Sequence, residues 1–465
     1  MPRSDSNLAA VTALPLELLQ KICSYLCCHC LRTHATVDCD DSQPELRDGT
    51  REGREALLNL TQACRVLNAV AEPFLYHCLH TSGKHALYSL IRTLGERPDL
   101  RSRVSAIDVG PARGTPPRSL PQPTLDAVLS HMRHAGLLRL YDARKSKDDP
   151  ETSPTMTEGA EHGTLVSSLL HLLPNVESFH LRLADNGSFR MPPESRFWKP
   201  WLKSLRRLAF SSAETPLMLN QVAHIIRLAP SVEVLHLSGV ACVTHIFPAF
   251  LNQRTPDNPP PLANLAELSL SDALLTVSSL GNVLEAVGPR LSKFSIRRRR
   301  PPLGLYGVPD CASFDATSTE LRRWSHTLKE LSLDLKGGAH SQPPCRLREF
   351  RALEVLHINP VAFDFNGNMS RTENALWSKL PNSIRELRLL EYNDRAVALR
   401  GLVNAYKAGV FPGLRKVEIH DKVFEEYEPE SEAAQELRNL CASFWAAGIE
   451  FVLRPEPRKP AIEEQ

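Results

Sequence analysis

The sequence predicts an α/β protein in which a helical N-terminal segment precedes stacked parallel strands with helices on their outer side. Three observations indicate this class: an apolar stripe with helical spacing near the N-terminus, a short apolar motif that recurs along the rest of the chain, and helical spacing between copies of that motif. The 465 residues exceed one compact core of ordinary size, which favours several domains or an elongated repeat array.

Composition restricts the partners and the compartment. Lys and Arg number 55 against 53 Asp and Glu, so the net charge of +2 gives no reason to expect nucleic acid or an anionic membrane as the partner. Residues 1–13 lack the apolar core of a secretory signal. Val234–Leu251, within the longest stretch free of Asp, Glu, Lys and Arg, is better explained as a strand and a loop than as a membrane span. We therefore expect reduced cysteines and a location in the cytoplasm and/or nucleus.

The first predicted element is a helix over Leu14–Leu26, after a flexible stretch at 1–12. Leu14, Leu18, Leu19, Ile22 and Leu26 recur at helical spacing and form one stripe. Pro15 suits the first helical turn, where its missing N–H is no loss. A second stripe with helical spacing covers Ala56–Val70.

The pattern L-P-x-E-L-L-x-x-I-x-x-Y-L over Leu14–Leu26 resembles the opening helix of an F-box, and L-x-x-x-C-R-x-L within Ala56–Val70 resembles its closing helices. The first hundred residues are similar to F-box proteins of filamentous fungi. The expected module spans 13–100, with an unusual insert at 27–55 that has to loop out. The resemblance implies contact with a Skp1-like adaptor through Leu14, Pro15, Leu18, Leu19, Ile22, Leu26, Leu57, Leu60 and Leu67.

The insert begins with Cys27-Cys28-His29-Cys30, followed by His34 and Cys39. These residues have the donor types and the C-x-x-C spacing of a zinc site. However, no second C-x-x-C or H-x-x-x-H pair completes a standard site. We therefore expect structural thiols, no metal and no cofactor, with zinc as the alternative.

From Val104 onward an aliphatic residue is followed three and five positions later by further apolar residues. The copies from Val176 to Leu414 are spaced by about 30 residues, close to the period of leucine-rich repeats. The copies begin at Val104, Val176, Leu205, Val232, Leu265, Leu291, Leu328, Leu353, Ile384 and Leu414, and a weaker one lies at Phe451/Leu453.

Helical spacing between the copies covers Leu165–Leu173, Val222–Leu228, Leu280–Val287, Ala398–Tyr406 and Ala434–Phe444. No single strand-helix unit can bury its own apolar face, so the units must stack. The sequence thus predicts a leucine-rich-repeat-like solenoid over 101–454, with a disordered loop at 141–163 and a flexible tail at 455–465. An unrelated α/β fold with parallel strands is the alternative.

The exposed strand positions of such an array form a rigid surface suited to an unknown protein substrate. The register places Arg182, Arg207, His236, Glu267, Lys293, Glu330, His357 and Arg388 there, together with Asp334, Glu386 and Glu418. Arg182 and Arg207 are the first candidates for recognising a phosphorylated partner. No catalytic motif is found, so we expect a chain that is not an enzyme.

The resemblance implies a substrate-recognition subunit of an SCF-type ubiquitin ligase, which joins a Skp1-like adaptor and cullin complex to a protein substrate. A non-catalytic leucine-rich-repeat scaffold without a role in degradation is the alternative. An enzyme with an unrecognised site is a third.

Overall fold

The structure is a computed structural model of the whole chain. It describes residues 13–27, 29–30, 44–81, 83–110, 130, 158–183, 202–212, 217, 219–242, 260–298, 313–335, 347–359, 377–390, 396–421 and 432–455. The chain divides into two compact units. Unit 1 contains Met1–Thr215 and His224–Val232, and unit 2 contains Pro216–Ala223 and Glu233–Gln465. The boundary passes through helix α11 (Leu219–Leu228).

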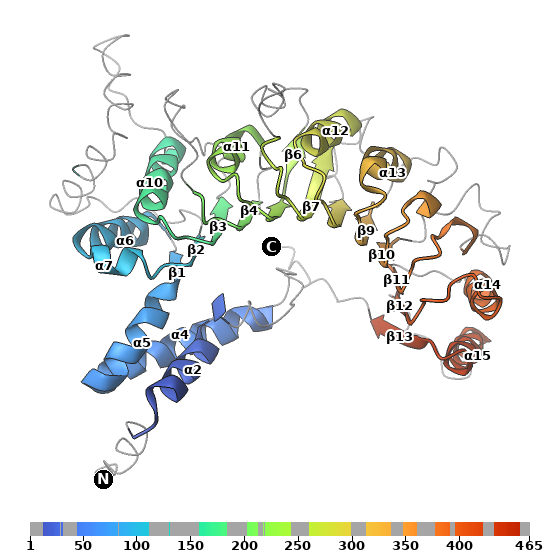
Figure 1. Cartoon of the computed structure of the whole chain (residues 1–465), viewed down its shortest axis with the longest axis horizontal. Helices are drawn as coiled ribbons and strands as arrows, with labels where there is room; N and C mark the ends of the chain where they lie inside the picture. The colour runs from blue at the N-terminus through green and yellow to red at the C-terminus, as the bar shows by residue number, and fades with distance from the viewer. Residues whose placement is uncertain are drawn as a thin grey trace, which may run out of the picture. The chain divides into compact units, whose positions relative to one another are not determined.

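Unit 1 begins with a helical module formed by α2 (Leu16–Leu26), α4 (Pro44–Ala63) and α5 (Arg65–His77) (Figure 1). One side of each helix is apolar, and these sides meet in a small common core. The core consists of the buried Leu19, Cys23, Leu57, Leu67, Val70 and Ala71, with the half-buried Leu26, Leu60, Cys64, Phe74 and Leu75 packed against them.

The helix expected over Leu14–Leu26 is confirmed, with Pro15 as its N-cap. The second stripe, Ala56–Val70, is not one helix, because Cys64 adopts an extended backbone (φ −162°, ψ 167°) between α4 and α5. The Cys64 Sγ accepts a hydrogen bond from the backbone N–H of Leu67 at 3.5 Å and so caps α5.

The expectation that the whole of 27–55 loops out is wrong, because α4 already begins at Pro44. Gly53 gives the physical reason for this packing. A Cβ placed on it would lie 2.5 Å from the carbonyl oxygen of Leu26, so the backbones of α4 and α2 approach at a distance that only glycine permits.

The remainder of unit 1 carries a parallel sheet in the order β1-β2-β3-β4. Helix α10 corrects a second expectation, since residues 158–163 of the predicted disordered loop are helical; residues 141–157 lie outside the described residues. The elements are β1 (Cys78–Thr81), α6 (Lys84–Glu96), α7 (Pro98–Arg101), β2 (Ala106–Val109), α10 (Glu158–Leu172), β3 (Ser178–Leu183) and β4 (Arg207–Ser212).

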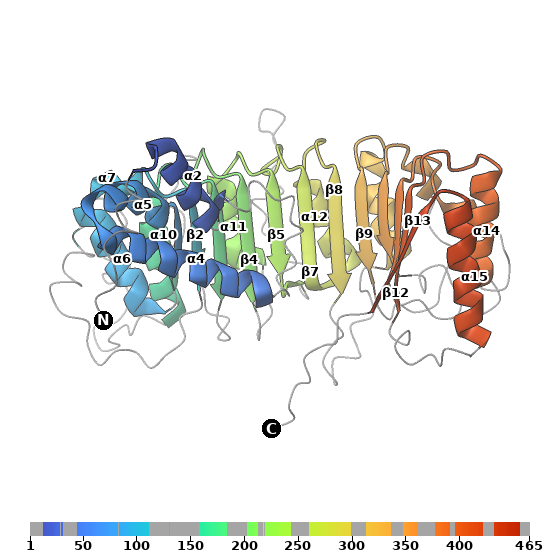
Figure 2. The ribbon, with the colours of Figure 1, turned by 90° about the horizontal axis from the view of Figure 1, so that it is seen from below.

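Unit 2 continues the alternation of strands and helices. Its strands are parallel and lie in the order β5-β7-β8-β9-β10-β11-β12-β13, with β6 paired to β7 (Figure 2). The strands are β5 (Val234–Ser238), β6 (Ala241–Cys242), β7 (Glu267–Leu275), β8 (Lys293–Arg298), β9 (Glu330–Asp334), β10 (Val355–Ile358), β11 (Glu386–Leu389), β12 (Lys416–Asp421) and β13 (Glu450–Pro455).

The helices α12 (Val277–Glu285), α13 (Phe314–Leu321), α14 (Ala396–Lys407) and α15 (Glu432–Ala446) of unit 2 lie on one face of these strands (Figure 1). Two connections carry short 3-10 helices instead, η2 (Leu347–Glu349) and η5 (Trp377–Lys379). One ladder of in-register apolar residues faces the helices, and all of its members except Phe451 are 0–1% exposed. They are Leu235, Leu268, Phe294, Leu331, Leu356, Leu387, Val417 and Phe451.

Every predicted copy of the apolar motif coincides with a strand, and each predicted helical segment coincides with a helix. Sequence reasoning did not predict β1, α6, α7, β6 or α13. The predicted N-terminal stretch 1–12 lies outside the described residues, as does the tail except for Pro455, which ends β13. No helix in the described part of the chain combines the length and the apolar character needed to cross a membrane.

Candidate functional site: an apolar helix face, a charged sheet face and a thiol-imidazole cluster

Helix α2 exposes an apolar face that the module does not cover. Leu14 is 36% exposed, Leu18 48%, Ile22 44% and Tyr25 56%. The spacing of three to four residues places Leu18, Ile22 and Tyr25 on one side of the helix, and Leu14 directly precedes its N-cap. Helices α4 and α5 also expose large apolar side chains, with Leu58 at 44% and Val66 at 52%. A group of exposed apolar residues of this kind is typical of a protein interaction surface.

Burial divides the residues that were expected to contact an adaptor. Leu19, Leu57 and Leu67 are only 2–4% exposed, so this conformation excludes them from direct contact with a partner. Leu26 and Leu60 are half-buried, whereas Leu14, Pro15, Leu18 and Ile22 are exposed. The reason is geometric, since consecutive helical residues point about 100° apart. Leu18 therefore faces outward while Leu19 enters the core.

The face of unit 2 opposite the helices carries charged side chains that neutralise one another. Lys293 Nζ lies 3.6 Å from Glu267 Oε1 and 3.2 Å from Glu330 Oε1, and Glu267 Oε1 lies 3.8 Å from His236 Nε2. The parallel register produces this row, because Glu267, Lys293 and Glu330 stand opposite one another on β7, β8 and β9.

A buried carboxylate organises the last strands of the same face. Glu418 on β12 is 1% exposed, and its oxygens lie 3.6 Å from Arg388, 3.2 Å from Lys416, 3.0 Å from His420 and 3.1 Å from Arg454. Desolvation opposes ionisation of Glu418, but these surrounding charges and hydrogen bonds outweigh it and lower its pKa. Arg388 was expected to face a substrate, and here its charge already compensates a buried anion.

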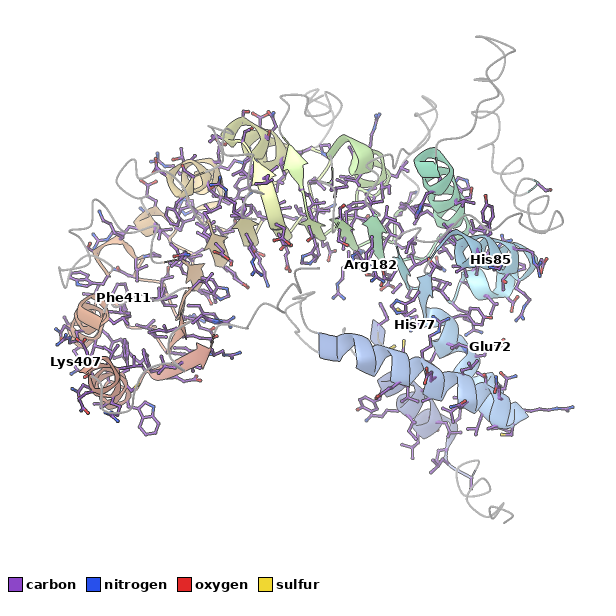
Figure 3. The ribbon with its side chains drawn as sticks, turned by 180° about the vertical axis from the view of Figure 1, so that it is seen from behind. Glu72, His77, His85, Arg182, Lys407 and Phe411 are labelled. Carbon is purple, nitrogen blue, oxygen red and sulfur yellow. The ribbon has the colours of Figure 1, made fainter. Side chains whose placement is uncertain are left out.

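In unit 1, Asp108 on β2 is likewise a carboxylate surrounded by basic side chains. Arg182 Nε and Nη2 donate hydrogen bonds to its two carboxylate oxygens at 3.1 and 2.8 Å, and His80 and His180 lie at 3.2 and 3.5 Å (Figure 3 labels Arg182). Burial raises the pKa of Asp108, but the His80 hydrogen bond and the His180 and Arg182 charges prevail and bring it to about 2. Arg182, a predicted contact to phosphate, is thus bound to a carboxylate.

The neighbouring strands β1 and β2 together carry a Cys–His–Asp alignment. Cys78 Sγ lies 3.5 Å from His80 Nε2, and His80 Nδ1 lies 3.2 Å from Asp108 Oδ2. This is the order of nucleophile, base and orienting group in thiol enzymes. Here the carboxylate is also held by Arg182 and His180, so the contacts of Asp108 join β1, β2 and β3.

The other residues that were predicted to contact a substrate lie on separate strands of the two units. His236 and His357 occupy equivalent strand positions, separated by Ser269, Ser295 and Ser332, so they are not adjacent. Arg207 is exposed at the start of β4. Asp108 was not predicted from the sequence, because its partners become neighbours only when the strands align.

A third cluster joins residues far apart in the chain. Cys27 Sγ lies 3.7 Å and Cys30 Sγ 3.3 Å from Nδ1 of His77, the last residue of α5. The three ligand atoms lie within 4.8 Å of one another. The Cys27–Cys30 pair was apparent in the sequence, whereas His77 was not identified. His34 and Cys39 lie outside the described residues.

Comparisons with protein-family models and with curated proteins give no match to this sequence.

Proposed function

We propose that the protein is a non-catalytic adaptor-docking subunit that uses the exposed face of α2 to bind a Skp1-like protein, and that it acts as a substrate receptor of an SCF-type ubiquitin ligase. The observation that carries the proposal is the apolar row Leu14, Leu18, Ile22 and Tyr25, which α4 and α5 leave uncovered. The F-box-like pattern over Leu14–Leu26 supplies the identity of the partner.

The physical chemistry supports docking of a rigid apolar helix face. Leu19 and Cys23 anchor α2 from the opposite side, so the exposed residues lose little conformational entropy when a partner covers them. A stable interface buries about 1,600 Å² in total, with apolar residues at its centre and polar ones at its rim. Glu17 is exposed on the same helix and would lie in such a rim, whereas Gln20 is exposed on the side away from the row.

The sheet face of each unit is proposed as a substrate surface, in a leucine-rich-repeat arrangement. The repetition of strand and helix and the rows of polar strand residues support this arrangement. Because Lys293, Glu418 and Asp108 neutralise their neighbours, a partner of mixed charge suits the face better than a polyanion. Ubiquitin transfer would take place on other subunits. A scaffold that binds an adaptor without promoting degradation is the second candidate.

Co-purification with a Skp1-type adaptor tests the docking function. We expect the full-length chain to capture the adaptor and Ile22→Asp to abolish capture, because a carboxylate in an apolar interface is left without a partner. The matched control is Gln20→Asp, which introduces the same charge at an exposed polar position of the same helix. Capture that survives Ile22→Asp, or no capture by the wild-type chain, would overturn the proposal.

Separating receptor from scaffold requires a second measurement. Proximity labelling with the Ile22→Asp chain identifies proteins held by the sheet face while degradation is disabled. A receptor predicts that some of these proteins become more abundant when the chain is deleted. A scaffold predicts unchanged abundance.

A further inference from the structure

The cluster of Cys27, Cys30 and His77 has the composition of a metal site. Cys27 ends α2, Cys30 follows three residues later, and His77 is the last residue of α5, where the chain enters β1 (Figure 3 labels His77). Cys27 is buried, and Cys30 and His77 are half-buried. Three donors from two distant segments therefore meet in a protected place within unit 1.

The three donor atoms of the cluster converge. Both sulfurs approach the same nitrogen, His77 Nδ1, at 3.7 and 3.3 Å, and all three atoms lie within 4.8 Å of one another. A cation placed between them can be bound by all three.

The two sulfur–nitrogen distances agree with tetrahedral zinc. Zinc binds sulfur at about 2.3 Å and imidazole nitrogen at about 2.05 Å, which places a sulfur and a nitrogen about 3.6 Å apart in a tetrahedron. The two observed separations, 3.7 and 3.3 Å, lie on either side of that value. The C-x-x-C spacing of Cys27 and Cys30 is also that of zinc ligands.

We propose that Cys27, Cys30 and His77 bind a structural Zn²⁺ ion. The ring of His29 lies 4.6 Å from that of His77, between centroids, but its nitrogens are not among the converging ligand atoms. Two thiolates and an imidazole form a donor set that selects zinc over hard cations such as Mg²⁺ or Ca²⁺. Binding releases one proton from each of the two thiols, because the ligands are thiolates.

The ion would connect two parts of unit 1. It ties the C-terminal end of α2 to the C-terminal end of α5 and hence to β1, the first strand of the sheet. Removing the metal loosens α2 at the end next to Cys27. The inference concerns the stability of the module and does not depend on adaptor docking, so each proposal can fail without the other.

Metal analysis of the full-length protein tests the site. Purified without chelator from zinc-supplemented medium, the wild-type chain is expected to contain one zinc ion per chain by plasma mass spectrometry. Cys30→Ser and His77→Gln are expected to lose it. Cys441→Ser is the matched control, since Cys441 is a half-buried cysteine of α15 in unit 2, and it is expected to retain the ion.

Two measurements on the wild-type chain keep the test decisive if a variant does not fold. Cobalt substitution is expected to give the visible absorption of a tetrahedral thiolate site. Iodoacetamide is expected to label Cys27 and Cys30 only after a chelator is added, whereas Cys441 is labelled equally with and without it. Wild-type protein that binds neither metal, a Cys27–Cys30 disulfide in the purified chain, or undiminished zinc in Cys30→Ser would overturn the proposal.

Discussion

The difference in exposure between the neighbouring residues Leu18 and Leu19 gives a direct prediction about docking. Leu18 is 48% exposed and Ile22 44%, while Leu19 is 4% exposed. Full burial of a Leu or Ile side chain stabilises by about 1.5–3 kcal/mol, so covering the exposed half of each contributes about 1 kcal/mol. The double variant Leu18→Ala/Ile22→Ala is therefore expected to lose about 2 kcal/mol of binding free energy, which weakens the dissociation constant about 30-fold.

The same reasoning predicts the opposite outcome for the neighbouring residue. Leu19→Ala removes a side chain from the module core and is expected to lower the free energy of unfolding by about 2–5 kcal/mol. The double variant should lower that free energy much less, because Leu18 and Ile22 are about half exposed and do not belong to the module core. Calorimetric titration of a Skp1-type adaptor, paired with urea unfolding of each variant, measures both quantities.

Two results would refute this reasoning. One is wild-type affinity in Leu18→Ala/Ile22→Ala, which would mean that the exposed row is not the docking face. The other is a loss of stability in the double variant as large as that of Leu19→Ala, which would mean that the row is part of the core.

Three further predictions concern the charged strand residues and a helix contact. Asp108→Asn should lower the free energy of unfolding of unit 1 by about 2 kcal/mol near neutral pH, because folding lowers the pKa of Asp108 from 3.8 to about 2. This stabilisation is present above pH 4 and is lost as the pH falls towards 2, so the hydrogen-exchange rates of the β2 amides in wild type and variant should become equal in acid. Glu418→Gln should lower the free energy of unfolding of unit 2 by about 2–3 kcal/mol, since it leaves Arg388, Lys416 and Arg454 without their anion; equal urea midpoints would contradict this. Gly53→Ala should separate α4 from α2 and lower the melting temperature. The control is Gly409→Ala, a position with positive φ and open space around it, where only backbone strain is added. A larger drop in melting temperature for Gly409→Ala than for Gly53→Ala would argue against close helix packing at Gly53.

Apolar periodicity was sufficient to predict the strands from β2 onward. It failed in the helical module, between α2 and α5. The strand motif depends only on alternation within a few residues, and its copies therefore mark every strand from β2 onward except the two-residue β6. The 27–55 segment was expected to loop out, because nothing local reveals that Gly53 fits against the backbone of Leu26. The break at Cys64 was missed for a related reason. It is stabilised by a cap on α5, in which Cys64 Sγ accepts a hydrogen bond from the backbone N–H of Leu67.

The sequence by itself determined which residues are apolar at which spacing, and hence the helices, the strands and the order of the parallel sheet. Only the tertiary structure decided which side of α2 is covered, because Leu18 and Leu19 are equally apolar and differ only in what packs against them. It likewise decided that Arg182 binds Asp108 and that His77 meets Cys27 and Cys30. Contacts between residues about 50 to 75 positions apart depend on how elements pack, which no local pattern encodes.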